Sequence, residues 1–339
     1  MTVAEAKLRV GTIWNLGRLR GWPLSGDVLD YAFWRGNEST PALSITPDGR
    51  GFKDHGTGKH GDMVTLLAEV GAVSVAEACR LLVQIAEGVA EAPAPIVLPP
   101  RATPEERRAK WPVFSPFPES AEFALARRRR LPHFAGIRAA SKRGLLVTLN
   151  CFDAGAIFPA PAWCVTDSAR VGAQVRRLDG KLWAKAGKTK SLPGSLGGWP
   201  IGAADIDDRP HVLLSEGEPD MLAAVTLCCL LNPDPVTQVP RDSGDLAFAT
   251  MCGAAKRIAE TALPRFAGRT VTLIPHVDGP GSASSEVWRG QLRAAGATVR
   301  TFDLRGLLND AGGQAKDLNA VVTDRGWAAY RDELRQFLP

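Results

Sequence analysis

The sequence predicts an α/β protein in which a parallel sheet flanked by helices is preceded by a small mixed α+β subdomain and a separate N-terminal unit. From about Arg209 onward, apolar strand-like segments alternate with helical ones, which is typical of a parallel sheet covered on both faces. Short alternating segments over 163–183 predict antiparallel hairpins. A stretch rich in Pro and Ala at 89–104 separates the first 88 residues from the rest.

The N-terminal unit, residues 1–88, is predicted to contain a hairpin followed by helices. Residues 42–46 alternate like a strand, Pro47-Asp48-Gly49 is a turn sequence, and a partner strand begins at Gly51. Residues 63–86 carry apolar side chains at helical spacing, interrupted near Gly71.

The middle of the chain is predicted to hold a linker and a small subdomain. Proline fixes φ and donates no backbone hydrogen bond, so we expect a stiff, extended linker over 89–110. A subdomain follows over 111–208. Its predicted strands and turn are 163–166, 173–178, the turn at Asp179-Gly180, and 181–183.

The parallel sheet is predicted over 209–305, with an extension over 306–339 that completes its site. Each strand is a short apolar run, and each helix follows a turn rich in glycine and proline. The expected strands are 211–214, 270–274 and 297–302, and the expected helices are 219–231 and 282–295.

Composition excludes several classes of protein. The 339 residues are 45% hydrophobic, enough for real cores, yet no run of about 18 apolar residues could span a membrane. The N-terminus has no secretory pattern, so we expect a cytoplasmic protein. The six cysteines form no CxxC pair, and we expect reduced thiols packed as small apolar groups.

The charge of the chain permits nucleic-acid binding without establishing it. The net charge is +5, and the sequence pI is about 9.0. One basic group is Arg127–Arg130, followed by Arg138, Lys142 and Arg143, and it is equally consistent with a solvated face. A second basic group precedes the acidic segments and comprises Arg176, Arg177, Lys181, Lys185, Lys188 and Lys190.

Acidic side chains follow the predicted strands where an open α/β sheet places its site. Glu216 comes directly after the first strand, and Asp220 lies in the first turn of the helix that follows. His276 and Asp278 follow the second strand, where two-residue alternation would place them on the same side. Asp317 follows the third strand and a loop.

Carboxylates gathered at one edge repel one another, and a divalent cation would offset that repulsion. Oxygen ligands favour Mg²⁺ or Mn²⁺ over zinc, and His276 would shift the preference toward Mn²⁺. The alternative is that each carboxylate only caps a helix or turn. We expect Glu216, His276, Asp278 and Asp317 as metal ligands, with Glu216, Asp220 and Asp278 as the catalytic residues.

These segments resemble the TOPRIM domain of bacterial DnaG-type primases, topoisomerases and related nucleases, and most closely that of phage primase-helicases. The similar segments are Ser215–Leu222, His276–Gly281 and Lys316–Asn319. His276 stands where that family usually has the first aspartate of an acidic pair. The resemblance extends upstream to Gln174–Arg177, and it implies that Arg176, Arg177, Lys188 and Lys190 contact nucleotide phosphates and template.

The first unit resembles the N-terminal zinc-binding domain of primases, with its metal ligands missing. Asp54 and Thr57 occupy the positions of the second cysteine pair, and Tyr31–Trp34 holds no ligand of the first pair. His55 and His60 alone do not make a tetrahedral site, so no zinc is expected. A packed core would then replace the metal. The residues that carry this resemblance are Thr40-Pro41, Phe52-Lys53, Gly58 and Gly61-Asp62. The expected core includes Trp22, Phe33 and Trp34.

The resemblance implies a primase that makes short RNA primers from nucleoside triphosphates on a single-stranded DNA template. Glu216 would act as general base or ligand, and Asp220 as a ligand or a residue that orients one. No Walker A motif occurs, so we expect a separate replicative helicase or initiator as partner, in a plasmid, phage or other mobile element. The alternatives are a TOPRIM nuclease and a non-catalytic DNA-binding accessory protein of replication.

Overall fold

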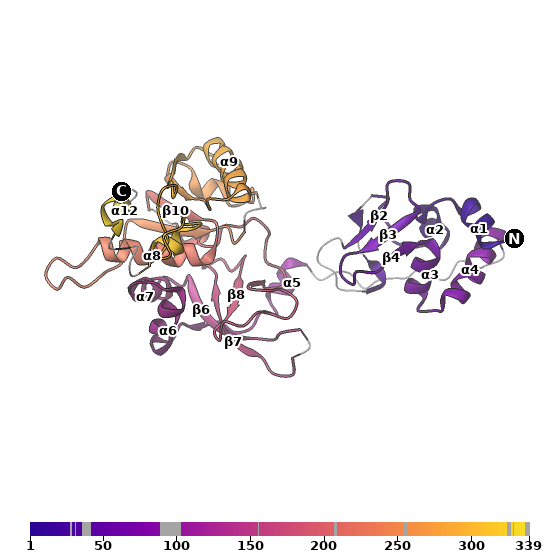
Figure 1. Cartoon of the computed structure of the whole chain (residues 1–339), viewed down its shortest axis with the longest axis horizontal. Coiled ribbons are helices and arrows are strands. Elements are labelled where there is room, and N and C mark those ends of the chain that lie inside the picture. The colour runs from indigo at the N-terminus through magenta and orange to yellow at the C-terminus, as the bar shows by residue number, and fades with distance from the viewer. Residues whose placement is uncertain are drawn as a thin grey trace. The chain divides into compact units, whose positions relative to one another are not determined.

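The computed structural model describes the chain as two compact units, Met1–Ala102 and Thr103–Pro339 (Figure 1). The described residues are 1–27, 29–30, 32–35, 42–88, 103–154, 156–206, 209–253, 257–323, 327 and 329–335. Residues 89–102 of the predicted linker therefore lie outside the description, as do Tyr31, Thr40, Pro41 and 336–339. In the part of the chain that is described, no helix is long and apolar enough to cross a bilayer.

The first unit is an antiparallel four-stranded sheet with helices before and after it. The sheet order is β1-β2-β3-β4, and the predicted hairpin is confirmed, since Ile45 pairs with Phe52 across the turn. The predicted helices are also confirmed, with the break just after Gly71. Its elements are α1 (Val3–Val10), α2 (Ile13–Leu19), β1 (Leu29–Asp30), η1 (Phe33–Arg35), β2 (Leu43–Ile45), β3 (Gly51–Asp54), β4 (His60–Asp62), α3 (Met63–Gly71) and α4 (Val75–Glu87).

The turn after β3, which contains Asp54 and Thr57, is closed by side-chain hydrogen bonds. Asp54 is 2% exposed, and its carboxylate accepts from the Thr57 hydroxyl at 2.7 Å and from the Gly56 N–H at 2.8 Å. The expected aromatic core is also present, because Phe33 packs against Trp22 and Trp34 with ring centroids 5.4 and 5.1 Å apart. These two positions do not supply the sulfur ligands of a structural zinc site, since the Asp54 oxygens accept hydrogen bonds within the turn and Thr57 offers only a hydroxyl.

The second unit begins with a five-stranded antiparallel sheet, in the order β5-β6-β7-β8-β9. The predicted strand over 181–183 is wrong: β8 pairs with Lys190–Ser191 instead. Trp183 instead forms an isolated bridge with Gly187, and its buried indole N–H donates to the Val175 carbonyl at 3.2 Å. The elements are α5 (Pro104–Arg108), β5 (Ser115–Pro116), α6 (Glu119–Arg129), α7 (Ala135–Lys142), β6 (Leu146–Cys151), β7 (Ala160–Val165), β8 (Gln174–Arg177), β9 (Lys190–Ser191) and η2 (Ala203–Asp205).

A parallel four-stranded sheet follows, as predicted, in the order β11-β10-β12-β13. The three expected strands are confirmed, and a fourth, β11, was not predicted. Its sequence, Leu-Ala-Phe-Ala-Thr, is apolar up to Thr250 and buried throughout, and periodicity alone cannot distinguish so short a run from a buried helical segment. The elements are β10 (His211–Ser215), α8 (Glu218–Leu231), β11 (Leu246–Thr250), η3 (Leu263–Phe266), β12 (Thr270–Ile274), α9 (Gly279–Ala294), β13 (Thr298–Thr301), α10 (Leu318–Val321) and α12 (Arg331–Arg335).

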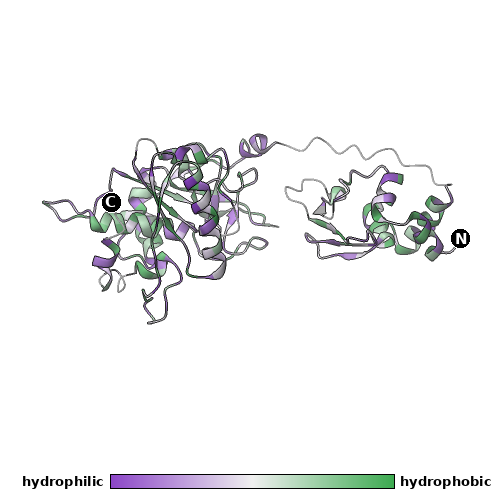
Figure 2. Cartoon of the chain, turned by 90° about the horizontal axis from the view of Figure 1, so that it is seen from above, coloured by the Kyte–Doolittle hydropathy of each residue, from purple (hydrophilic) through white to green (hydrophobic). Residues whose placement is uncertain are grey.

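The strand order positions the site. From β10 the chain moves one way through α8 to β11, and from β12 it moves the other way through α9 to β13. Because such crossovers are right-handed, α8 and α9 lie on opposite faces of the sheet, as Figure 1 shows. The ends of β10 and β12 are therefore a topological switch point, where open α/β sheets bind ligands. Apolar residues concentrate inside each unit (Figure 2).

Helix α8 is held against α7 at a contact with no spare room. A Cβ at Gly136 would lie 2.1 Å from the Thr226 hydroxyl oxygen and 2.4 Å from its Cα. The contact fixes α8, which carries Asp220, relative to the preceding subdomain.

Replacing Gly136 with Ala should therefore destabilise the second unit by about 1–3 kcal/mol, because backbone cannot move aside as a flexible side chain can. Gly290→Ala is the matched control, since a Cβ there meets nothing within 4 Å and alanine favours the helix. Scanning calorimetry of the full chain measures both. A Gly136→Ala transition at or above the wild-type temperature would contradict the packing.

Candidate functional site

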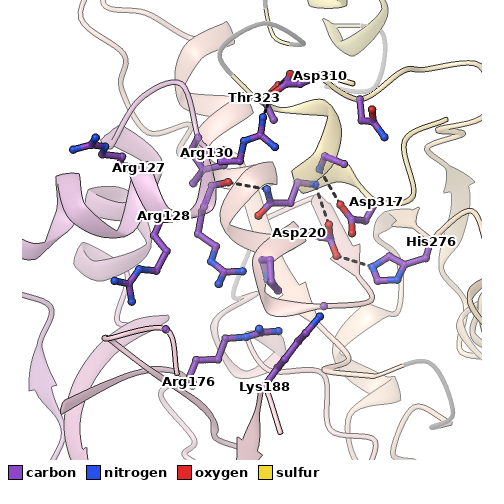
Figure 3. Close-up of a pocket in the computed structure, with 18 of the residues that line it drawn as sticks. Arg127, Arg128, Arg130, Arg176, Lys188, Asp220, His276, Asp310, Asp317 and Thr323 are labelled. Carbon is purple, nitrogen blue, oxygen red and sulfur yellow. Dashed lines mark hydrogen bonds and ion pairs between the residues drawn. The ribbon is translucent and has the colours of Figure 1, made fainter. Parts of the chain in front are cut away.

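A cavity of about 1210 Å³ opens beside the switch point of the second unit. One wall is basic, and the other carries acidic and imidazole groups (Figure 3). In that view Arg176 and Lys188 lie across the cavity from Asp310 and Thr323. The basic lining residues are Arg127, Arg128, Arg129, Arg130, Arg176, Arg177, Lys181 and Lys188, and the acidic and imidazole ones are Asp220, His276, Asp310 and Asp317.

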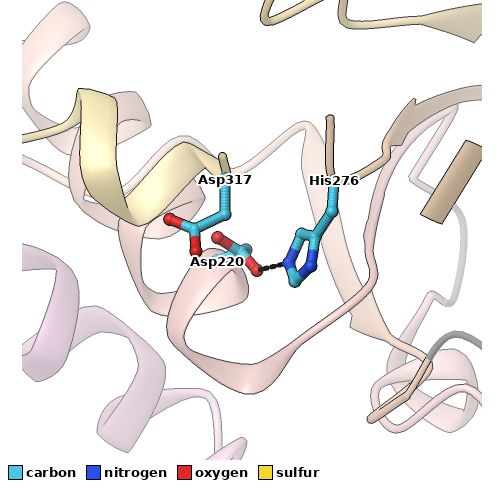
Figure 4. Close-up of side chains that lie close together, drawn as sticks. All are labelled: Asp220, His276 and Asp317. Carbon is cyan, nitrogen blue, oxygen red and sulfur yellow. Dashed lines mark hydrogen bonds and ion pairs between the residues drawn. The ribbon is translucent and has the colours of Figure 1, made fainter. Parts of the chain in front are cut away.

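Three side chains converge in this cavity although they are far apart in the sequence. Asp220, His276 and Asp317 each offer a ligand atom, and these atoms all lie within 4.8 Å of one another (Figure 4). Asp220 lies in the first turn of α8, His276 follows β12, and Asp317 is the N-cap of α10. We call these three residues the acidic cluster.

Asp220 is the buried centre of the cluster, with 2% of its surface exposed. One carboxylate oxygen accepts from His276 Nε2 at 2.8 Å, and the other accepts from the Asn319 backbone N–H at 3.0 Å. Burial raises the pKa of Asp220 because it disfavours the charged form, and the His276 hydrogen bond opposes that rise. The nearby N-terminus of α8 also favours negative charge here.

His276 lies between two carboxylates. Its Nδ1 is 3.1 Å from Glu216 Oε1, and its Nε2 is 2.8 Å from Asp220 Oδ2. Burial disfavours the charged imidazole, but the hydrogen bonds and charges of Asp220 and Glu216 outweigh it and raise the pKa of His276 to about 10. Glu216, which is 7% exposed, is thereby tied to the acidic cluster through His276.

The structure does not bring Asp278 into this cluster, in contrast to the expectation from sequence. Its carboxylate caps α9, accepting from the Gly281 N–H at 2.8 Å, and it pairs with Lys316 Nζ at 3.0 Å. The Gly281 hydrogen bond lowers the pKa of Asp278, burial opposes that effect, and Lys316 lowers it further.

The acidic cluster fits a divalent cation. Ligand atoms bound at about 2.0–2.4 Å from one ion lie within about 4.8 Å of each other, which is the spacing of these three side chains. Two carboxylates and one imidazole suit Mg²⁺, and the imidazole is better matched to Mn²⁺. Asp220, His276 and Asp317 would hold the ion, with Glu216 adjacent. His276 would first have to give up the proton that its two carboxylate partners stabilise, because only a neutral imidazole binds a metal.

The basic wall contains two arginines against one buried tryptophan. The guanidinium carbons of Arg129 and Arg176 lie 5.7 and 5.9 Å from the centre of the Trp163 ring. Arg176 pairs with Glu218, which is 2% exposed. Burial and the nearby Arg176 charge lower the pKa of Arg129, and its buried Nε has no hydrogen-bond partner.

The other basic residues expected at the site differ in their positions. Arg177 lines the cavity and pairs with Asp179 at 2.6 Å, and Lys188 lines the cavity with its side chain exposed. Lys190 is not among the residues that line the cavity. Its Nζ donates to the Phe152 carbonyl at 2.6 Å and lies 5.3 Å from the centre of the Trp183 ring.

Three further residues join the walls, and sequence reasoning assigned them no role. The side-chain amide of Asn319 donates to the Arg129 backbone carbonyl at 2.9 Å, while its backbone N–H binds Asp220. Asp310 accepts from Arg130 and from the Thr323 hydroxyl. The segment Lys316–Asn319 pointed to Asn319, but no local pattern could identify partners 99 and 190 residues away.

No protein-family model matches this sequence, and no curated protein matches it. Among solved structures, the chain is similar to the zinc-binding and RNA polymerase domains of the Aquifex aeolicus primase, with 12% identity, 98% of this chain and 85% of that chain covered, and a TM-score of 0.37. It is also similar to the primase fragment of the bacteriophage T7 primase-helicase, with 14% identity, 89% of this chain and 96% of that chain covered, and a TM-score of 0.39. For a DNA primase domain from Pseudomonas aeruginosa, the identity is 17%, 59% of each chain is covered, and the TM-score is 0.36.

Asp317 and Asp278 form a matched pair for testing the cation site. Both carboxylates are helix N-caps, and asparagine caps a helix as well as aspartate does. Asp317→Asn should weaken Mn²⁺ binding about 10- to 100-fold, by the loss of one charged ligand. Asp278→Asn should leave the affinity within about twofold, because its carboxylate is used by Gly281 and Lys316. Titration calorimetry measures both, and equal losses in the two variants would refute the assignment.

Proposed function

We propose that this protein is a primase-like nucleotidyltransferase, which joins nucleoside triphosphates into short RNA primers on single-stranded DNA. The observation that supports it most is that the acidic cluster and an arginine-rich wall share one cavity. A nucleotide triphosphate needs both, since its phosphates require cations along their length and the reacting phosphate needs a divalent ion.

The basic wall would bind the triphosphate. Arg176 is held by Glu218 and Trp163, so its remaining N–H groups are preorganised toward the cavity. Arg177 and Lys188, which also line the cavity, would add positive charge. Guanidinium groups suit bidentate contacts to phosphate, and a lysine acts as a mobile point charge.

The acidic cluster would bind the cation, which when bound polarises the reacting phosphate and lowers the pKa of the attacking 3′-hydroxyl. In the reaction the 3′-oxygen forms a bond to the α-phosphorus and the bond to the β-phosphate oxygen breaks, releasing pyrophosphate. We assign Glu216 as acceptor of the hydroxyl proton, because its carboxylate adjoins the cluster. Asp220 and Asp317 would be ligands, oriented by Asn319 and by the α10 backbone.

One observation favours a second candidate, a non-catalytic DNA-binding accessory protein. The charged imidazole of His276 already neutralises part of the charge of Glu216 and Asp220. A site that is internally neutralised in this way needs a cation less than three free carboxylates would.

Primer synthesis is the direct test. The full chain is incubated with a single-stranded DNA template, labelled nucleoside triphosphates and Mg²⁺ or Mn²⁺. Wild type should form short RNA, and Asp220→Asn should lower the rate about 100-fold or more, because it removes a buried charge at the reacting centre. Asp303→Asn is the control, since Asp303 is exposed and pairs with Arg305 outside the cavity.

The products separate the candidates. Shortened DNA in place of RNA would assign a nuclease, and a gel shift with no product under either metal would assign the accessory protein. Full primer synthesis by Asp220→Asn would remove the cluster from the mechanism.

A further inference from the structure

Two loops at one end of the antiparallel sheet are tied together beside the cavity. They are 152–159, which joins β6 to β7, and 178–189, which joins β8 to β9. The Asp153 carboxylate accepts from the Ala184 N–H at 2.9 Å, and Lys190 Nζ donates to the Phe152 carbonyl at 2.6 Å. We call them the paired loops, and of their residues only 155 lies outside the description.

The paired loops present large apolar side chains to solvent. The exposed fraction is 84% for Ile157, 80% for Phe158, 61% for Leu182 and 56% for Phe152. Among the described phenylalanines three are exposed, and two of them are in this short segment. Exposed apolar side chains are ordinary when scattered, but a group of them in adjoining loops marks an interaction site.

The surroundings of these side chains are basic. Lys181, Lys185 and Lys188 are exposed, and none forms an ion pair with another described residue. The two nearby acids, Asp153 and Asp179, are both engaged by Arg177, at 3.7 and 2.6 Å. The free charge of the paired loops is therefore positive, which favours a polyanion as occupant.

We propose that the paired loops bind a single strand of nucleic acid, with bases stacked on Phe152 and Phe158 and phosphates contacting Lys181 and Lys185. Stacking requires the faces of the bases, which a duplex hides and a single strand exposes. The surface is continuous with the cavity, because Lys181 and Leu182 line both. The path from the loops toward the acidic cluster rests on the proposed function, in which that strand is the template.

The test is binding of a fluorescent single-stranded oligonucleotide to the full chain, followed by anisotropy over a range of salt concentrations. Phe158→Ala should weaken binding about tenfold, as expected for the loss of one stacked base, and leave the salt dependence unchanged. Lys185→Ala should instead lower the salt slope by about 0.7, the value for one phosphate contact on a single strand. Phe123→Ala is the control for Phe158→Ala, since Phe123 is an exposed phenylalanine on α6. A third loop variant is Ile157→Ser, and its control is Val236→Ser, because the two side chains are 84% and 87% exposed.

Weaker binding by the loop variants, with wild-type binding by the controls, supports the proposal. Loop variants that bind like wild type overturn it and assign the exposed side chains to another partner, such as a protein. A wild type that prefers duplex also overturns it. Binding is read without catalysis, so a wild type that binds through Phe158 but makes no primers keeps this surface and rejects the proposed function.

Discussion

The arrangement of the second unit depends on the hydrogen bonds and charges that compensate the buried carboxylate of Asp220. An ionised group with 2% exposure costs several kcal/mol unless hydrogen bonds and charge compensate it. Its compensation comes from three directions: the start of α8, the imidazole of His276 after β12, and the backbone N–H of Asn319 in α10. The parallel sheet, its switch point and the segment that returns α10 to the sheet edge together supply these partners.

The same cavity holds charges of both signs on facing walls. Within each wall like charges crowd together, as the effect of Arg176 on Arg129 and of Asp317 on Asp220 indicates. A cation bound together with a polyphosphate would relieve the repulsion within both walls. The cation would neutralise the acidic wall, the polyphosphate would neutralise the basic wall, and the two ligands would attract one another. Asn319 joins the walls directly, so the position of the acidic cluster is coupled to that of helix α6.

Much of the fold could be predicted from local pattern, whereas the partners within the site could not. Apolar runs with helices between them identified β10, β12 and β13, but the similar run of β11 could not be distinguished from a buried helical segment. Glu216, Asp220, His276 and Asp317 are predictable as candidates, because each follows an apolar strand-like run or begins the helix after it. Asp278 was expected beside His276 because alternation holds along a strand, yet β12 ends at Ile274 and the chain then turns into α9, which Asp278 caps. Glu218 and Arg129 gained their roles from contacts that no short segment encodes.

The hydrogen bond between Asn319 and Asp220 spans 99 residues of chain. Closing so long a stretch of chain costs entropy before the contact forms, so we expect such contacts to form after local helices and hairpins. An incompletely folded chain therefore offers isolated carboxylates, and only the finished sheet presents them as a group. A divalent ion that requires the whole group would bind the native state alone, and its concentration would then raise the free energy of unfolding.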